Sequence, residues 1–210
     1  KNLKQKKILS VFHDAGSANI GALFIKNKKI KTRFYCKGPA EKIFQKYFKN
    51  FKNEKNFKNL FKETDVVLTG TSSKNLIEHR AREICIKKKI QSISFIDHWV
   101  GYENGFKRNK KIVLPNILLV NNLKAFQIAK KIFKKTKILK IKNYYEIDIL
   151  KKVKKKIKKS HNFLYFLEPI NNHLEFKALD KFLKYLKENK KIKNIIFKLH
   201  PSEKKNKYLV

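Results

Sequence analysis

Short apolar runs alternate with amphipathic stretches along most of the chain. The apolar runs have the length and composition of buried strands, and the segments between them place apolar residues at helical spacing. The predicted strands are 6–12, 31–36, 65–68, 92–97, 116–120, 137–141, 162–169 and 194–199. The predicted helices are 20–26, 39–51, 75–89, 123–133, 147–160 and 173–191.

Strands that alternate with helices in this way form parallel sheets that are covered on both faces. The pattern therefore predicts an α/β fold with a doubly wound, parallel, Rossmann-like sheet. We expect this domain to span residues 1–150, a basic linker or helix to occupy 151–160, and a second Rossmann-like domain to begin in 161–210. An alternative is that 151–160 is an exposed helix within a single domain. About 50 residues rarely complete such a domain, so we expect the second one to be cut short.

The formal net charge of +37 raises the question of nucleic-acid binding. Of the 53 basic residues, however, only four are arginine, while lysine, asparagine and isoleucine are enriched together. This joint bias is typical of an AT-rich genome, and a nucleic-acid-binding surface normally uses more arginine. We therefore expect the charge to reflect drift, and nucleic acid not to be the main partner. A lysine-rich module that binds nucleic acid or an anionic membrane stays open as an alternative.

The sequence gives some indications of compartment. No apolar stretch approaches the length of a membrane span, and the apolar run after the basic start is too short for a signal peptide. Cys36 and Cys85 form no paired motif, which fits a reducing compartment. We expect a cytoplasmic protein with peripheral contact at the inner face of the membrane. No His, Cys, Asp or Glu spacing resembles a zinc site, although a divalent cation could enter with a nucleotide diphosphate.

Polar clusters follow four of the predicted strands. In an open parallel sheet, ligands bind beyond the carboxyl ends of the strands, so these clusters are the candidate site. Its members are His13 and Asp14; Gly70, Thr71 and Ser72; Asp97, His98 and Trp99; and His200, Ser202 and Glu203. We expect the first, third and fourth clusters to converge along a common rim.

The segment "HDAGSAN" is predicted to be a strand-to-helix turn. Gly16 permits close backbone approach or a positive φ, and Ser17 or Asn19 can cap the helix. The helix N-terminus would suit a phosphate or carboxylate, with Asp14 or His13 as a general base. A plain helix cap beside a surface His-Asp pair is the alternative. The chain holds neither a G-x-G-x-x-G fingerprint nor a P-loop.

Two further segments are ambiguous. In the long irregular stretch 98–111, Trp99, Tyr102 and Phe106 could stack on a sugar or base, or could plug the top of the sheet. The "LTGTSS" loop could bind sugar hydroxyls or phosphates, or could be a capped turn. Four charged or titratable residues lie on the helix at 75–89 and are interpreted as surface ion pairing: Glu78, His79, Arg80 and Arg82. The alternative is that His79 or Arg80 reaches the crevice.

The segments "LYFLEP" and "KLHPSE" place a strand that ends in His-Pro about 35 residues after the strand that opens the second half. This arrangement resembles the His-Pro motif of GT-B-fold bacterial transferases, which include sialyl- and polysialyltransferases and the transferases of capsule and teichoic-acid polymers. The "HDAG" turn and the "DHW" segment also resemble bacterial surface-polysaccharide proteins of this architecture.

The resemblance implies a glycosyltransferase with two Rossmann-like domains. His200 would contact the phosphate of a nucleotide-sugar donor, and Ser202 and Glu203 lie in the same loop. The first domain would bind a carbohydrate or glycolipid acceptor, with Asp14 as the base. GT-B second domains continue well past the His-Pro loop, and this chain departs from the family pattern there. A nucleotide-sugar epimerase or hydrolase of the same architecture is the alternative enzyme.

Overall fold

The computed structural model describes residues 3–72, 75–98, 102–153, 162–167, 174–189 and 194–199. The chain divides into two compact units, Lys1–Val153 and Lys154–Val210. The division falls inside the segment 151–160. Each unit is described by itself.

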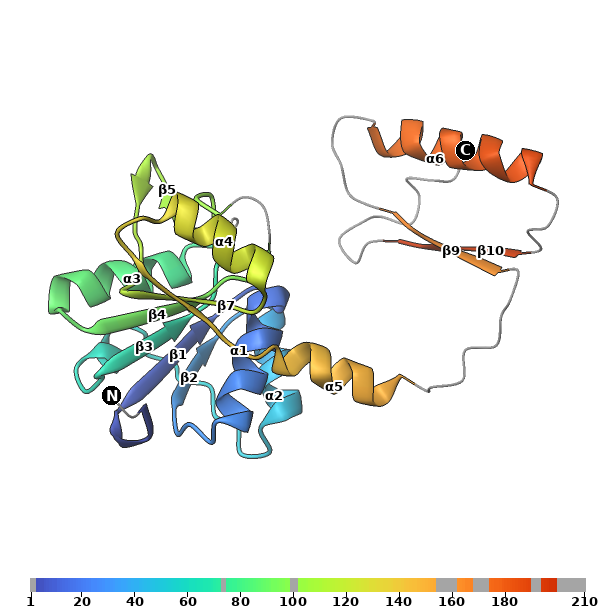
Figure 1. Ribbon diagram of the computed structural model, residues 1–210. Helices are drawn as coiled ribbons and strands as arrows, with labels where there is room; N and C mark the ends of the chain where they lie inside the picture. The colour runs from blue at the N-terminus through green and yellow to red at the C-terminus, as the bar shows by residue number, and fades with distance from the viewer. Residues whose placement is uncertain are drawn as a thin grey trace. The chain divides into compact units, whose positions relative to one another are not determined.

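A six-stranded parallel sheet forms the centre of the first unit (Figure 1). Its strand order is β2-β1-β3-β4-β7-β8, and every neighbouring pair is parallel. The strands are β1 (Ile8–Phe12), β2 (Arg33–Cys36), β3 (Val66–Thr69), β4 (Gln91–Phe95), β7 (Ile117–Val120) and β8 (Lys137–Lys140). The predicted α/β class with a doubly wound parallel sheet is confirmed.

Helices cover both faces of this sheet. The core on one face includes residues of α1, α2 and α5, while α3 and α4 pack on the opposite face. Their bounds are α1 (Ala15–Asn27), α2 (Pro39–Tyr47), α3 (Ile77–Lys88), α4 (Leu123–Ile132) and α5 (Tyr144–Lys152). The described part of the unit also contains two short 3₁₀ helices, η1 (Leu3–Gln5) and η2 (Asn59–Phe61).

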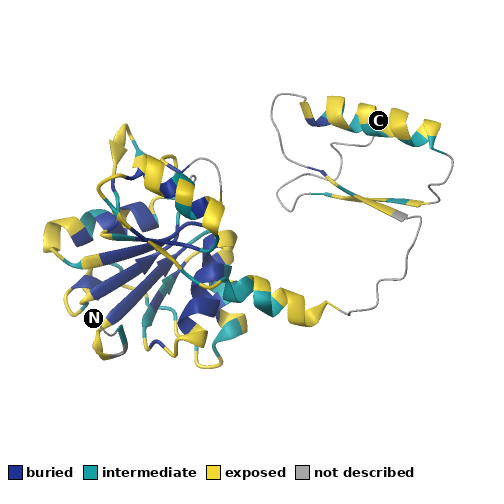
Figure 2. Ribbon diagram, in the orientation of Figure 1, coloured by how far each residue is buried: buried dark blue, intermediate teal, exposed yellow. Residues whose placement is uncertain are grey.

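The central strands are buried on both faces, as a parallel sheet between two helical layers requires (Figure 2). All five residues of β1 are buried. On the face of α1 and α2, Phe12 packs against Phe44 and Phe95, with ring centroids 5.2 and 6.0 Å apart. On the other face, Leu9 and Val11 belong to the core cluster that contains residues of α3.

Several elements differ from their predicted bounds. The helix predicted at 39–51 ends at Tyr47, because Phe48 has an extended backbone. The helix predicted at 20–26 begins at Ala15, because the chain turns into α1 only three residues after β1 ends. The helix predicted at 147–160 begins at Tyr144, and its predicted end lies outside the described residues. The stretch 98–111, predicted to be irregular, contains part of a small hairpin, β5 (Lys107–Arg108) and β6 (Lys111–Ile112), whose two turn residues both have positive φ.

The two edge strands of the sheet differ in what lies along their outer edges. Along β2, the Asn53 side chain pairs with the backbone of Cys36, accepting from its N–H and donating to its C=O, each at 2.8 Å. The backbone N–H of Glu54 donates to the carbonyl of Phe34. At the opposite edge, β8 exposes Lys137 and Lys140. Charged lysines on an edge strand oppose pairing with another chain.

The second unit contains a β-α-β arrangement. The strands β9 (Asn162–Phe166) and β10 (Asn194–Lys198) pair in parallel, and α6 (Leu174–Glu188) lies between them in sequence. Phe182 of α6 stacks on Tyr165 of β9, with ring centroids 4.6 Å apart. The strand, the helix and the strand predicted in this part of the chain are therefore present in the predicted order. Among the helices of the described ranges, none is both long enough and apolar enough to cross a membrane.

Candidate functional site

The strand order places a topological switch point between β1 and β3. The chain moves from β1 to β2 on one side and then returns to place β3 on the other side of β1. The loops that follow β1 and β3 therefore leave the sheet in opposite directions. In an open α/β sheet the crevice lies between two such loops, at the carboxyl ends of the strands. Ligands of open α/β sheets bind at such a point.

The His13–Asp14 pair stands directly at this crevice. The Nδ1 atom of His13 lies 2.6 Å from Oδ1 of Asp14, which makes a short hydrogen bond. The two side chains are 21% and 36% exposed, so both can be reached from solvent. In enzymes that use histidine as a general base, an acidic side chain often accepts a hydrogen bond from the imidazole in this way and orients the ring.

Gly38, in the loop between β2 and α2, supports the other side of the imidazole. It has φ +55° and ψ −139°, a conformation that favours glycine. A Cβ atom placed on Gly38 would lie 2.8 Å from Nε2 of His13. The backbone N–H of Ala40 donates to the carbonyl of His13 at 3.0 Å. The loop therefore fits closely around the ring and leaves no room for a side chain at position 38.

Asp97, after β4, reaches the N-terminus of α1. A Cβ on Gly16 would lie 1.8 Å from Oδ2 of Asp97, so only glycine admits this carboxyl group. The hydroxyl of Thr71 donates to Oδ1 at 3.3 Å, and Nε2 of His98 lies 3.5 Å from Oδ2. The prediction that Gly16 permits close approach is confirmed. The N-terminus of α1, predicted to suit an external anion, already has the protein's own carboxyl group beside it.

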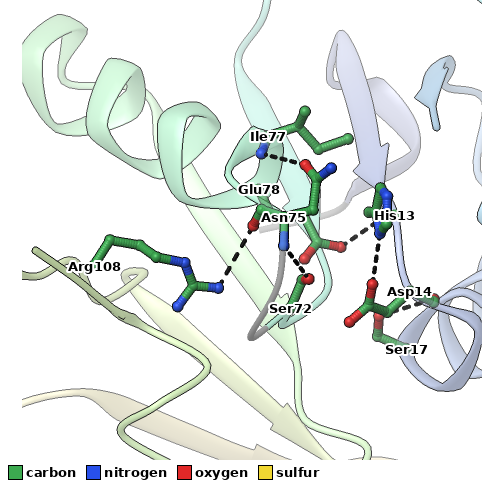
Figure 3. A network of polar contacts seen from close by, with 8 residues as sticks. All are labelled: His13, Asp14, Ser17, Ser72, Asn75, Ile77, Glu78 and Arg108. Atoms are coloured by element: carbon green, nitrogen blue, oxygen red, sulfur yellow. Dashed lines mark hydrogen bonds and ion pairs between the residues drawn. The ribbon is translucent and has the colours of Figure 1, made fainter. Parts of the chain in front are cut away.

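Glu78 of α3 lies beneath the same crevice (Figure 3). The residue is only 1% exposed, and its Oε1 atom accepts a hydrogen bond from the backbone N–H of His13 at 3.1 Å. A Cβ on Gly70 would lie 2.8 Å from the same oxygen and 2.0 Å from Oγ of Ser17. Glu78 thus contacts the loops after both β1 and β3. Among the described residues, its Oε2 atom has no hydrogen-bond partner.

Burial dominates the electrostatics of these acidic groups. It raises the pKa of Glu78 to about 8, although the charge of Arg82 acts in the opposite direction. Burial also raises the pKa of Asp97, and the nearby carboxyl of Asp14 adds to this effect. The crevice therefore brings together three carboxyl groups in a protein of formal charge +37.

Arg82 of α3 is a cation that contacts several of the segments around the candidate site. It is fully buried, and it donates to the carbonyls of Val113, Gly70 and Gly105 at 3.0 to 3.2 Å. Its guanidinium also lies over the Phe106 ring, 4.8 Å from the centroid. Burial lowers the pKa of Arg82 to about 10, so the side chain remains charged at neutral pH. Through these hydrogen bonds Arg82 connects α3 to the loop after β3 and to the segment before β7.

Several of the residues predicted to bind a ligand make hydrogen bonds with the backbone of the protein itself. Ser17 and Ser72 are buried; the hydroxyl of Ser17 donates weakly to the carbonyl of Asp14 at 3.4 Å, and that of Ser72 accepts from the N–H of Asn75 at 2.9 Å. Asn19 donates to the carbonyl of Ala15. The expectation that Ser17 or Asn19 caps the helix is wrong, because α1 begins at Ala15 and its N-cap position is Asp14.

The remaining predicted residues divide into two groups. Thr71 is half-buried and His98 is exposed, so both can be reached from solvent. Trp99, His200, Ser202 and Glu203 lie outside the described residues. Tyr102 and Phe106, considered as stacking residues or as a plug, are buried in a core cluster with residues of α4 and β7, which favours the plug.

Sequence reasoning missed the roles of Glu78 and Arg82. Both were interpreted as surface ion pairs, whereas both are buried. A signal was present, because positions 78, 82 and 85 share one face of α3, and Cys85 is an apolar residue on that face. Charged residues that share a helix face with a buried apolar residue indicate a buried network of charged groups as readily as they indicate a solvent-exposed face.

The fold and the site together define an α/β protein of Rossmann-like type with an acidic crevice at its switch point. Comparison of the chain with protein-family models gave no match, and comparison with curated proteins gave no significant match. Within the described ranges, no group of three or more His, Cys, Asp or Glu side chains is arranged to hold a metal ion. Cys36 and Cys85 are buried free thiols.

Proposed function

We propose that the chain is a glycosyltransferase-like protein that transfers a sugar from a nucleotide-sugar donor to a carbohydrate or glycolipid acceptor. In this proposal residues 1–153 bind the acceptor. The observation that carries the proposal is the His13–Asp14 pair at the switch point, with Nδ1 and Oδ1 2.6 Å apart. A base held in this way, in an open crevice, suits the removal of a proton from a hydroxyl group.

The charge of the crevice supports a hydroxyl-bearing ligand rather than a phosphate. Asp14 and Asp97 both lie at the N-terminal end of α1, where their carboxyl groups would repel a phosphate. Carboxylates accept hydrogen bonds well from sugar hydroxyls. Thr71 and His98 add further polar groups at the same rim. The crevice therefore fits the acceptor side of the reaction better than the donor phosphates.

The proposed step needs no group beyond the two substrates and this pair. Nδ1 of His13 donates to Asp14, which leaves Nε2 to accept the proton of the acceptor hydroxyl. The hydroxyl oxygen forms a bond to the anomeric carbon of the donor. The bond between that carbon and the phosphate oxygen breaks, and the nucleotide leaves with the electron pair. Asp14 stabilises the imidazolium that results.

The resemblance of the "KLHPSE" segment to the His-Pro motif supports a donor site in the second unit, with His200 at the phosphate. A glycolipid acceptor would bring the protein to an anionic membrane surface, which suits its excess of lysine.

The test is acceptor-dependent release of nucleotide by the purified chain. CMP-, UDP- and CDP-linked sugars are incubated with and without oligosaccharide acceptors, and free nucleotide is measured. We expect release that requires an acceptor, and His13→Gln to lower kcat by about 10²–10⁴, the usual contribution of a general base. Asp14→Asn should also lower kcat, because the imidazole loses its orienting partner.

Asp148→Asn is the matched control, since it removes a carboxylate near Lys26 in the last turn of α1, at the end of the helix opposite the crevice. Release without any acceptor, lost in His13→Gln, would instead favour the hydrolase alternative. Absence of nucleotide release together with absence of donor and acceptor binding by calorimetry would contradict the proposal.

A further inference from the structure

A small basic cavity lies outside the acidic crevice, between α3 and the β5–β6 hairpin. Its volume is about 290 Å³. Its lining is rich in cations and amides and contains one carboxylate. The lining residues are Leu76, His79, Arg80, Glu83, Arg108, Asn109 and Lys111.

Two of the residues that line this cavity are arginines. The protein has four arginines among 53 basic residues, and Arg80 and Arg108 both line this one cavity. Where composition favours lysine, an arginine marks a position at which a planar, multiply donating group is used. Arg33 and Arg82 fit this rule, because both donate to several backbone carbonyls. Arg108 likewise donates to the backbone carbonyls of Asn104, Lys107 and Asn75. The side chain of Arg80, by contrast, is exposed and makes no hydrogen bond or ion pair with another described residue.

The charge balance of the cavity favours an anion. Glu83 is its one carboxylate, and Nζ of Lys111 lies 3.3 Å from that group. Within the described part of the chain, neither Arg80 nor Arg108 pairs with a carboxylate. Two buried polar atoms in the lining, Nδ1 of His79 and Nε of Arg108, have no hydrogen-bond partner among the described residues. His79 itself is only 5% exposed. A guanidinium without a partner among the described residues, that of Arg80, beside two unpartnered buried nitrogens is a feature of a site that awaits an acceptor group.

We propose that this cavity binds a phosphate group, held chiefly by Arg80 and Arg108. The cavity, at about 290 Å³, lies at the small end of the range of ligand pockets and has room for a phosphate group with a small organic substituent. A guanidinium binds phosphate through two parallel N–H donors. The phosphate can belong to a soluble phosphomonoester or to a lipid headgroup, and the two sources share this chemistry.

The cavity is linked to the candidate site through the loop before α3. Nη2 of Arg108 lies 3.5 Å from the carbonyl of Asn75, whose N–H donates to Ser72 (Figure 3). If the crevice binds an acceptor, as proposed above, then this acceptor carries a phosphate that reaches the cavity. That last step rests on the proposed function, whereas the phosphate site itself does not.

The test measures phosphate binding by the full chain without any sugar substrate. Glycerol 1-phosphate is titrated calorimetrically at 0.3 M salt, where exposed lysines are well screened. Arg80→Gln should weaken binding at least tenfold, and Arg80→Lys should weaken it less. Lys87→Gln, which removes one charge from an exposed residue in the last turn of the same helix, is the matched control and should have little effect.

Vesicles of phosphatidylglycerol, compared with phosphatidylcholine, form the second arm. Sensitivity to Arg80→Gln with glycerol 1-phosphate assigns a soluble ligand, and the same sensitivity with vesicles alone assigns a lipid headgroup. Equal effects of Arg80→Gln and Lys87→Gln in both arms, or no saturable binding in either, would overturn the proposal. Since sugar transfer is not measured, failure here is distinct from failure of the proposed function.

Discussion

Glu78 shows how one buried carboxyl group can connect two loops of a site. It accepts from the backbone N–H of His13, and it lies against Gly70 in the loop after β3. Within the described part of the chain no ion pair neutralises it, and burial keeps the carboxyl protonated at neutral pH. The residue that stabilises the base-bearing loop is therefore itself sensitive to pH.

The stability of the protein should depend on pH through Glu78. Its pKa is about 8 in the folded protein against an ordinary value of 4.5, so between these values the folded state holds more protons than the unfolded state. The free energy of unfolding should then fall as pH rises from about 4.5 to 8, by up to about 1.4 kcal/mol per pH unit. Glu78→Gln should remove this slope and make the protein more stable than wild type near pH 9. Urea unfolding at several pH values measures it.

Glu103→Gln, which changes an exposed glutamate, is the control for this comparison. Parallel pH profiles for wild type and Glu78→Gln would show that the carboxyl of Glu78 does not titrate in this range.

At the scale of elements, the loops after the strands decide the shape of the crevice. The segment between β2 and α2 holds His13 from one side, and its backbone at Gly38 takes a conformation that other residues seldom adopt. The backbone of this connection can therefore position the side chain of His13, although Gly38 itself has no side chain.

Gly38→Ala should disturb the crevice more than the rest of the fold. The new Cβ would meet Nε2 of His13 at 2.8 Å, and the positive φ adds strain of about 1–3 kcal/mol. We expect lower stability in urea unfolding and a loss of acceptor binding in calorimetry. Lys37→Ala, at the neighbouring exposed residue, should leave acceptor binding unchanged. Unaltered stability and binding in Gly38→Ala would show that the loop does not constrain the ring.

The sequence pattern predicted the elements of the fold better than the connections between them. Apolar runs such as β1 and β3 follow directly from their composition, because strands buried on both faces must be continuous in apolar residues. The β5–β6 hairpin was missed because Asn109 and Lys110 lack the glycine that usually marks such a turn.

The candidate site was predicted in position but only partly in its chemistry. The rule that polar residues after parallel strands meet at one edge located His13, Asp14 and Asp97. The contact between Asp97 and the start of α1 could not be predicted, because it depends on the packing of residues far apart in sequence. The same holds for the burial of Glu78 and Arg82.

On the scale of the whole molecule, charge is unevenly distributed by sign. Only 16 residues are acidic, and Asp14, Glu78 and Asp97 interact within one crevice. At physiological ionic strength the Debye length is about 8 Å, so a ligand in the crevice is influenced by the groups that line the crevice more than by distant lysines. A strongly basic protein can therefore contain a site whose local charge differs from that of the protein as a whole.

The exposed lysines of β8 have a consequence for how copies of the protein behave in concentrated solution. Lys137 and Lys140 lie on a strand whose outer edge has no partner within the described residues. Replacing both with glutamine should let these edges associate, and light scattering should detect the growth of particles over hours. The same pair of changes at Lys130 and Lys131, in the last turn of α4, removes equal charge from a helix and should not do so. If the two double variants aggregate alike, overall charge is responsible and not the strand. If only the variant of β8 aggregates, the lysines on this strand contribute to colloidal stability by keeping neighbouring molecules from joining their sheets.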